Sequence, residues 1–384
     1  MIGVVSLDNA PAKNIAGLPL PLRTLLLAQA EGAEWLGVMG ERAEESVTRW
    51  RADDRVRVPL RVLTAAPPEE HLAVRGDTLL DRATVRALLA APAVLFDGTE
   101  VLAVHRRGGH DGGLFDDGGE GSLRDVTGWR RVRSADEATA AVDHLLQSLR
   151  KPQDGMVSRA INRTLSLAVT RVLCRTGMRP NTVSVGILAI GAVGAWLATL
   201  GTPGALAVGG LLFQAQSVLD GCDGELARLT FRGSKAGEWI DTVGDDLTNY
   251  AFFAGMTVGL TRAGLGPWSM VFGAVGVLAG FVASGIEYRY LLAVGSGDLT
   301  KYPLGFGDDP SGAVEERGLQ RLLARARPLF KRDFFVFATM LATALGRYAS
   351  LVMLGLFAAG ALVTLSAVLR SEWSRRGALP GKTP

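Results

Sequence analysis

Long stretches without a charged residue constrain the fold of this chain more than any other feature. The longest has 38 residues, 182–219, and is interrupted by a Gly-Thr-Pro-Gly turn at 201–204. Because about 20 apolar residues span a bilayer, this stretch predicts two transmembrane helices joined by a short turn. Uncharged runs of 19 and 22 residues, 268–286 and 348–369, predict two more. Segments 239–260 and 334–346 complete a prediction of six spans, the fifth being the shortest.

Lys and Arg gather on one side of these spans. They crowd the segment before the first span, the second-to-third and fourth-to-fifth connections, and the tail, whereas the opposite connections carry only Arg262 and Arg347. The positive-inside rule therefore predicts an integral protein of the cytoplasmic (inner) membrane with both termini in the cytoplasm. Because no basic n-region and apolar h-region precede Asp8, we expect no cleaved signal peptide and a cytoplasmic N-terminal domain.

The first 150 residues have the pattern of a soluble α/β domain. Segments 1–7, 37–39 and 56–63 indicate strands, 21–32 and 134–149 indicate helices, and the glycine-rich 108–121 indicates a loop. The fold class predicted is thus an α-helical integral membrane domain of six transmembrane helices, preceded by a soluble α/β domain. We place the boundaries at 1–150 for the α/β domain, 181–372 for the membrane domain and 373–384 for a tail.

Residues 151–180 connect the two domains. In 156–174, arginines alternate with apolar residues, a pattern typical of an amphipathic helix at the membrane surface beside anionic lipid. A linker helix packed on the soluble domain explains the pattern equally well. The small net charge of +3 gives no case for nucleic-acid binding, and the cysteines Cys174 and Cys222 are too few for a disulfide scaffold or a cysteine-based zinc site.

Acidic residues cluster where the second and third spans meet. Asp220 and Asp223 share one helical stripe with Gly224, Ala227 and Arg228, and a stripe on the next helix contains Gly237, Asp241 and Asp245. Facing helices would bring four carboxylates together, which is costly without a cation. Hard oxygen ligands at this density favour Mg²⁺, Mn²⁺ or Ca²⁺. The alternative is that these acids are solvated helix ends or partners of nearby basic residues.

These residues carry a family resemblance. The pattern Asp-x2-Asp-Gly-x2-Ala-Arg-x8-Gly-x3-Asp-x3-Asp resembles the signature of the CDP-alcohol phosphotransferase (CDP-alcohol phosphatidyltransferase) family at every specified position. Six transmembrane helices with the signature on the second and third match that family too. The resemblance implies a transferase that moves a phospho-alcohol from a CDP-alcohol donor to an acceptor hydroxyl and releases CMP.

The resemblance also implies roles for individual residues. Asp220, Asp223, Asp241 and Asp245 would hold two Mg²⁺ or Mn²⁺ ions, and Asp245 would be the general base. The nucleotide would lie against Gly224, Ala227, Arg228 and Gly237. Lys331 and Arg332 are candidates for acceptor binding, although a positive-inside anchor explains them equally well. Family members are typically homodimers, which implies a homodimer here.

The N-terminal domain is similar to sugar-nucleotide cytidylyltransferases in residues 14–24 and at Gly76 and Asp77. Joined to the membrane domain, it resembles the bifunctional inositol-1-phosphate cytidylyltransferase and di-myo-inositol phosphate phosphate synthase group. Two departures predict that this half is inactive. Residues 6–12 contain no glycine for a phosphate cradle, and Arg131 and Arg133 stand where acidic residues would face a metal. An unrelated α/β domain is the alternative.

Three functions follow. The first is a CDP-alcohol phosphotransferase using CDP-inositol and an inositol phosphate acceptor. The second is a CDP-diacylglycerol-dependent phosphatidyltransferase that makes a phospholipid from a polar alcohol. The third, an inert membrane scaffold, fits poorly because a scaffold has no need of four costly carboxylates.

Overall fold

The structure is a computed structural model, and it describes residues 1–108, 113–116, 121–123, 127–150, 154–303 and 332–377. The chain divides into two compact units. The first comprises 1–149 with the short segments 174–177 and 229–232, and the second comprises the rest. Each unit is described by itself below.

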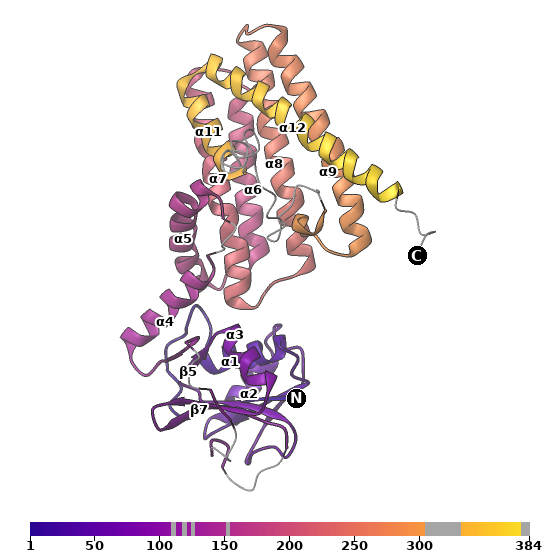
Figure 1. Cartoon of the computed structure of the whole chain (residues 1–384). Coiled ribbons are helices and arrows are strands. Elements are labelled where there is room, and N and C mark those ends of the chain that lie inside the picture. The colour runs from indigo at the N-terminus through magenta and orange to yellow at the C-terminus, as the bar shows by residue number, and fades with distance from the viewer. Residues whose placement is uncertain (109–112, 117–120, 124–126, 151–153, 304–331, 378–384) are drawn as a thin grey trace. The chain divides into compact units, whose positions relative to one another are not determined.

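The first unit alternates strands and helices (Figure 1). Its strands are β1 (Ile2–Ser6), β2 (Trp35–Met39), β3 (Leu60–Val62), β4 (His71–Val74), β5 (Thr78–Leu80), β6 (Ala93–Asp97), β7 (Glu100–Arg106), β8 (Gly121–Leu123) and β9 (Trp129–Arg131). Its helices are α1 (Leu20–Ala30), α2 (Ala43–Arg51), α3 (Arg82–Ala90) and α4 (Ala135–Ser148).

A seven-stranded mixed sheet forms the centre of this unit, in the order β3-β2-β1-β4-β7-β6-β8. Strand β1 pairs in parallel with both β2 and β4, while β7 runs antiparallel to β4 and β6. Side chains alternate across β1, so Val5 packs with α1 and α2 on one face while Ile2 and Val4 pack with Leu114 on the other. Strands β5 and β9 form a separate antiparallel pair.

The α/β pattern predicted from the sequence is confirmed in this unit. Strands β1 and β3 and helix α4 lie within the predicted segments, and β3 is shorter than predicted. Strand β2 begins two residues before the predicted 37–39, and α1 spans residues 20–30 where 21–32 was predicted. Helix α4 begins with a capping box in which the Ser134 hydroxyl accepts from the Glu137 amide and the Glu137 carboxylate accepts from the Ser134 amide. Most of the predicted loop 108–121 lies outside the described residues.

The second unit is helical. It begins with a π-helical turn, η1 (Ser158–Asn162), and continues through α5 (Arg163–Thr176), α6 (Pro180–Ala198), α7 (Pro203–Thr230), α8 (Lys235–Arg262), α9 (Pro267–Val294), the 3₁₀ turn η2 (Leu299–Lys301), α11 (Arg332–Leu345) and α12 (Arg347–Gly377). Three of these helices begin at a proline, Pro180, Pro203 or Pro267. Proline suits the first helical position because the amide hydrogen it lacks would have no partner inside the helix.

Small residues allow α6 and α8 to pack with their backbones in close contact. A Cβ on Gly255 would collide with the Ala195 carbonyl, and one on Gly259 would collide with the Ala198 carbonyl. The turn between α6 and α7 is equally tight, because Gly201 has a φ of +66° and a Cβ there would meet the Gly259 carbonyl. This packing fixes the position of α8, which carries two of the predicted metal ligands.

Four helices in the described part of the chain are long and apolar enough to cross a membrane: Pro180–Ala198, Pro203–Thr230, Pro267–Val294 and Arg347–Arg375. They correspond to four of the six predicted spans. The other two segments are also helical, but α8 carries several acidic residues and α11 has only 14 residues. Six spans therefore remain a prediction, whereas a helical region with four candidate spans is observed.

Candidate metal centre and the cavity beside it

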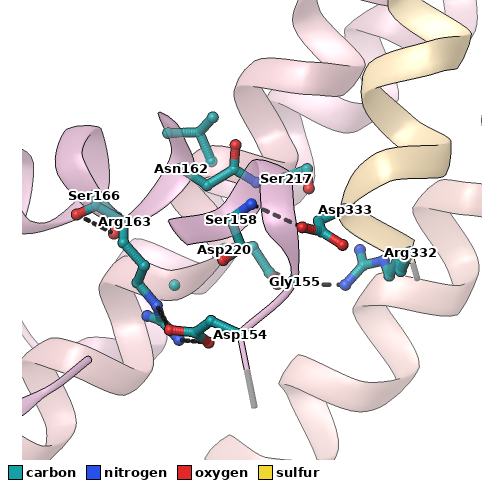
Figure 2. Close-up of a pocket in the computed structure, with 12 residues that line it drawn as sticks. Asp154, Gly155, Ser158, Asn162, Arg163, Ser166, Ser217, Asp220, Arg332 and Asp333 are labelled. Carbon is teal, nitrogen blue, oxygen red and sulfur yellow. Dashed lines mark hydrogen bonds and ion pairs between the residues drawn. The ribbon is translucent and has the colours of Figure 1, made fainter. Parts of the chain in front are cut away.

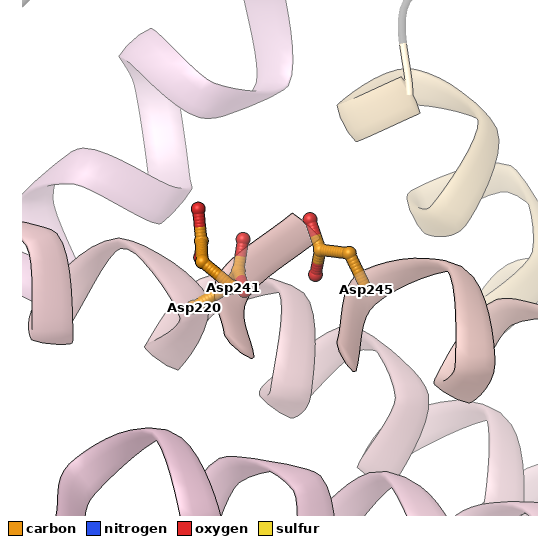
Figure 3. A group of neighbouring side chains, drawn as sticks. All are labelled: Asp220, Asp241 and Asp245. Atoms are coloured by element: carbon orange, nitrogen blue, oxygen red, sulfur yellow. The ribbon is translucent and has the colours of Figure 1, made fainter. Parts of the chain in front are cut away.

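Three of the four predicted carboxylates come together. Asp220 lies on α7, and Asp241 and Asp245 lie one turn apart on α8. Each offers a carboxylate oxygen, and these oxygens all lie within 4.8 Å of one another (Figure 3). Asp241 is exposed, while Asp220 and Asp245 are half-buried. Such a group of hard oxygen donors matches the ligands that Mg²⁺ and Mn²⁺ take in proteins.

Arg332, the first residue of α11, neutralises part of this acidic group. Its Nη2 donates to Asp245 Oδ1 at 2.6 Å, its Nη1 donates to Asp245 Oδ2, and Nη1 also reaches Asp220 Oδ2 at 3.4 Å. A paired fork of this kind is the strongest geometry between a guanidinium and a carboxylate. Arg332 was predicted to bind the acceptor; the structure brings it directly to the carboxylates. Lys331 lies outside the described residues.

Asp223, the fourth predicted carboxylate, is held differently. It is 7% exposed and accepts a hydrogen bond from the Ser184 hydroxyl of α6. Its other oxygen accepts from the Gly224 amide at 2.5 Å. The carboxylate therefore has fixed partners on α6 and on its own helix, and it is not one of the three whose oxygens gather within 4.8 Å.

The residues predicted to bind the nucleotide lie on the same two helices. A Cβ on Gly224 would lie 3.4 Å from the Arg228 guanidinium one turn later, so the absence of a side chain leaves room beside that cation. A Cβ on Gly237, near the start of α8, would lie 3.3 Å from Asn181 Oδ1. Ala227 is half-buried and Arg228 is exposed.

Glu225 lies on α7 close to Asp220 and Asp223, and the sequence analysis did not identify it. Its carboxylate is fully buried on α7 and accepts from three donors of α5: Arg163 Nη1 at 2.7 Å, Ser166 Oγ at 2.8 Å and Thr170 Oγ1 at 2.7 Å. Arg163 also forms a two-pronged pair with Asp154, at 2.8 and 3.0 Å. These bonds fasten α5 to the helix that carries Asp220.

Arg163 keeps its positive charge between these two carboxylates. Its hydrogen bond with Asp154 raises the pKa of the guanidinium above its usual value, and the bond with Glu225 adds to that effect against the opposing effect of burial. No local sequence signal identified Glu225, because its partners lie 55–62 residues earlier in the chain.

A cavity of about 340 Å³ opens beside these residues (Figure 2). Side chains of η1, α5, α7 and the start of α11 line it, and almost all are polar: Asp154, Ser158, Asn162, Arg163, Ser166, Ser217, Asp220, Arg332 and Asp333. Asp333 accepts from the Ser158 amide at 2.7 Å, which ties α11 to the π-helical turn. The cavity thus adjoins Asp220 and offers hydroxyl, amide, carboxylate and guanidinium groups to a polar ligand.

Residues 178–303 match the sequence model of the CDP-alcohol phosphatidyltransferase family. The matched region is less than half of the chain. The match includes the whole aspartate pattern and helices α6 to α9, and the enzymes of the family are transferases of substituted phosphate groups.

Curated relatives of the CDP-alcohol phosphatidyltransferase region cover part of the chain. The "Bifunctional IPC transferase and DIPP synthase" of Aquifex aeolicus is 27% identical over 253 residues, 65% of this chain and 51% of that protein. The protein of the same name from Thermococcus kodakarensis is 34% identical over 131 residues, 34% of this chain and 29% of that protein. The chain therefore spans about half the length, or less, of the curated relatives it matches.

Solved structures give a weaker likeness. The Mycobacterium tuberculosis phosphatidylinositol phosphate synthase PgsA1 with CDP-DAG bound matches with a TM-score of 0.42 at 18% identity, covering 58% of this chain and 100% of that one. The same protein with manganese and citrate gives 0.40 at 20% identity, covering 57% of this chain and 93% of that one. The likeness to the CDP-alcohol phosphatidyltransferase family rests on the sequence match over residues 178–303.

Proposed function

We propose that this chain is a metal-dependent CDP-alcohol phosphotransferase, which moves a phospho-alcohol from a CDP-alcohol to an acceptor hydroxyl and releases CMP. The observation that carries the proposal is the convergence of Asp220, Asp241 and Asp245, whose oxygens lie within 4.8 Å in a region of that family. Three carboxylates this close repel one another unless cations are present.

The residues fit a divalent cation, because the gathered donors are all carboxylate oxygens. Asp220, Asp241 and Asp245 would hold it, and Asp223, tied to Ser184, is the further ligand we propose for a second ion. When bound, Mg²⁺ or Mn²⁺ would neutralise the pyrophosphate of the donor and stabilise the departing CMP. Gly224, Ala227, Arg228 and Gly237 would provide the surface against which the nucleotide lies.

Asp245 is the proposed general base. Both of its oxygens accept from Arg332 in the described structure, and each oxygen keeps a second lone pair with which it can take the proton of the acceptor hydroxyl. Arg332 also lines the polar cavity, and we propose that it binds an anionic group of the acceptor there. Lys331 is the second acceptor ligand that we propose from the sequence. Arg332 would thereby link the proposed base to acceptor binding.

Two donor classes remain for this proposal. The names of the curated relatives and the polar lining of the cavity favour CDP-inositol with an inositol phosphate acceptor. The second candidate is CDP-diacylglycerol with a polar alcohol acceptor; it is supported by the position of Asp220 on α7, a helix long and apolar enough to reach lipid. An inert scaffold accounts for neither the gathered carboxylates nor the cavity.

The setting of the enzyme is part of the proposal. We infer six spans in an inner membrane, both termini in the cytoplasm, a segment 151–180 that rests on anionic lipid, and a homodimer. Supporting the interfacial segment, Ile161, Leu165 and Val172 are exposed along one side of η1 and α5.

The test is CMP release by the detergent-purified chain and by Asp245→Asn. Because a general base contributes about 10²- to 10⁴-fold, the variant should lose CMP release by that factor while remaining folded and able to bind nucleotide. Asp136→Asn, which makes the same change in the first turn of α4, should release CMP at the unaltered rate. Unchanged turnover in Asp245→Asn would exclude its role as the base.

A further inference from the structure

The α/β unit has a place where sheets of this kind usually bind ligands. Strand β1 pairs in parallel with β2 on one side and with β4 on the other. The chain adds β2 and β3 on one side of β1 and then crosses to add β4 on the other side, so the strand order reverses between β1 and β4. In open α/β sheets, ligands bind outside the carboxyl ends of the strands at such a point. Two segments of this chain meet there: residues 7–12 after β1, and Gly76 and Asp77 after β4.

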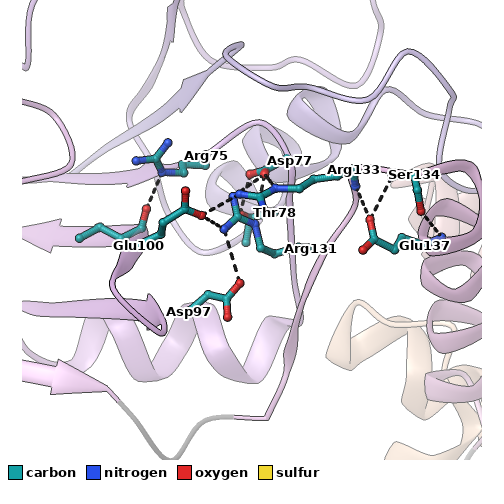
Figure 4. Close-up of polar contacts among 10 residues, drawn as sticks. Arg75, Asp77, Thr78, Asp97, Glu100, Arg131, Arg133, Ser134 and Glu137 are labelled. Carbon is teal, nitrogen blue, oxygen red and sulfur yellow. Dashed lines mark hydrogen bonds and ion pairs between the residues drawn. The ribbon is translucent and has the colours of Figure 1, made fainter.

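Asp77 has no exposed side-chain surface, and two arginines bind one oxygen of its carboxylate. Oδ2 accepts from Arg131 Nη2 at 2.8 Å, from Arg131 Nε at 3.2 Å and from Arg133 Nε at 3.0 Å (Figure 4). Oδ1 accepts from the Thr78 hydroxyl at 3.3 Å. The guanidinium groups thus lie where a cation bound to Oδ2 of Asp77 would have to be.

Backbone pairing between β5 and β9 determines where these arginines lie. In the β5–β9 pair, Arg131 stands opposite Thr78, the residue after Asp77. The Val132 amide donates to the Asp77 carbonyl at 2.8 Å, so the backbone pairing of the two segments extends to Asp77. The register of β5 and β9 therefore places Arg131 beside Asp77 through the backbone.

The two arginines of this cluster are shared among three carboxylates. Arg133 Nη2 donates to Glu100 at 2.7 Å, and Arg131 Nη1 donates to Glu100 and lies 3.4 Å from Asp97. The hydrogen bond from Arg131 lowers the pKa of Glu100, so this carboxylate stays charged. With two cations among three acids, the cluster offers neither a strong anion site nor a free carboxylate pair for a divalent ion.

The loop after β1 leaves no cradle for a triphosphate. Its own groups are bonded locally, with Ser6 Oγ donating to Asp8 at 2.7 Å and the Ala10 amide donating to the Leu7 carbonyl at 3.1 Å. Gly76 packs directly against it, since a Cβ there would collide with the Ser6 carbonyl and lie 3.1 Å from Ala10. A phosphate cradle needs unpaired amides and open space at this position.

We infer that the α/β unit does not bind a metal–nucleotide complex and that Asp77 serves as the buried centre of a structural ion-pair cluster. This inference, joined to the proposed function on which its second half rests, places the enzyme in a reaction sequence. A separate nucleotidyl transfer must supply its donor. In that reaction a phosphate oxygen of a phospho-alcohol attacks the α-phosphorus of CTP, the bond from this phosphorus to the α–β bridging oxygen breaks, pyrophosphate departs and the CDP-alcohol is formed.

The first experiment measures two products from one preparation of the purified chain in detergent. With CTP, inositol 1-phosphate and Mg²⁺ we expect no pyrophosphate above the blank, whereas CDP-inositol with inositol phosphate tests CMP release independently. Pyrophosphate release would overturn the inference whatever the CMP result. Absence of CMP with every donor would count against the proposed function and leave the inference on the α/β unit standing.

The second experiment tests Asp77 directly. In a chain that carries Asp220→Asn, Asp223→Asn, Asp241→Asn and Asp245→Asn, we expect the electron paramagnetic resonance spectrum of Mn²⁺ with CTP to be the same with and without the protein. Adding Asp77→Asn should lower the Tm of the α/β unit by about 10 °C, because two arginines then lose their buried partner.

The control for this Tm shift is Asp97→Asn, whose half-exposed carboxylate meets Arg131 only at 3.4 Å and should lower Tm far less. Mn²⁺ bound through Asp77, or an Asp77→Asn variant with unaltered Tm, would contradict the structural role.

Discussion

Replacing Arg163 by methionine tests the buried network that holds α5 on α7, the helix that carries Asp220. The side chains of Glu225, Asp154 and Arg163 are 0%, 8% and 11% exposed. In Arg163→Met, the Glu225 carboxylate keeps only two hydroxyl donors, and its charge is left buried without a cation. Breaking a buried pair in this way costs about 3–5 kcal/mol.

That cost converts into a measurable shift. For a unit of roughly 200 residues, 1 kcal/mol moves Tm by about 2–4 °C, so Arg163→Met should melt about 6–20 °C lower. The assay is thermal unfolding of the detergent-solubilised chain. Arg159→Met, which removes the same charge from an exposed position in η1, should shift Tm by no more than about 2 °C.

A double variant separates charge from packing. Arg163→Met combined with Glu225→Leu removes both charges and should regain part of the lost stability, since an apolar pair can replace a buried ion pair. Equal Tm shifts for Arg163→Met and Arg159→Met, or a double variant no more stable than Arg163→Met, would refute this account of the network.

Two further variants probe the helices around the site. Gly259→Leu should lower Tm by several degrees, because its side chain would collide with the Ala198 carbonyl, whereas Gly360→Leu, with open space around it, should not. Ser184→Ala should raise the Mn²⁺ concentration needed for half-maximal CMP release about 10- to 100-fold with a smaller effect on kcat, because Asp223 loses the hydroxyl that orients it. An unchanged Mn²⁺ requirement would contradict that role for Asp223.

The sequence predicted the features that depend on local pattern. Uncharged runs bounded by glycine and proline predicted α6, α7, α9 and α12, because an apolar helix must be both long and free of charge to lie in lipid. Helical spacing also placed Asp241 and Asp245 on one side of α8, and the structure brings them to Asp220. These predictions need only the period of a helix and the cost of a buried charge.

Features that depend on tertiary pairing could not be predicted. Asp223 was expected to face the other three acids, yet it bonds with Ser184, which lies 39 residues earlier. Arg332 meets Asp245 across 87 residues, and no local pattern signals such a pair. In the α/β unit, Arg131 and Arg133 were recognised as unsuited to a metal site, but only the β5–β9 register shows that they bind Asp77.

The most direct test of the central claim is Mg²⁺- or Mn²⁺-dependent CMP release by the purified chain. CDP-inositol and CDP-diacylglycerol are offered in parallel, each with inositol, inositol phosphate and glycerol phosphate, with and without EDTA. We predict that one donor yields CMP and that EDTA abolishes the release. Failure of every pair to release CMP from folded protein, or release that EDTA leaves unchanged, would contradict the proposed metal-dependent transfer.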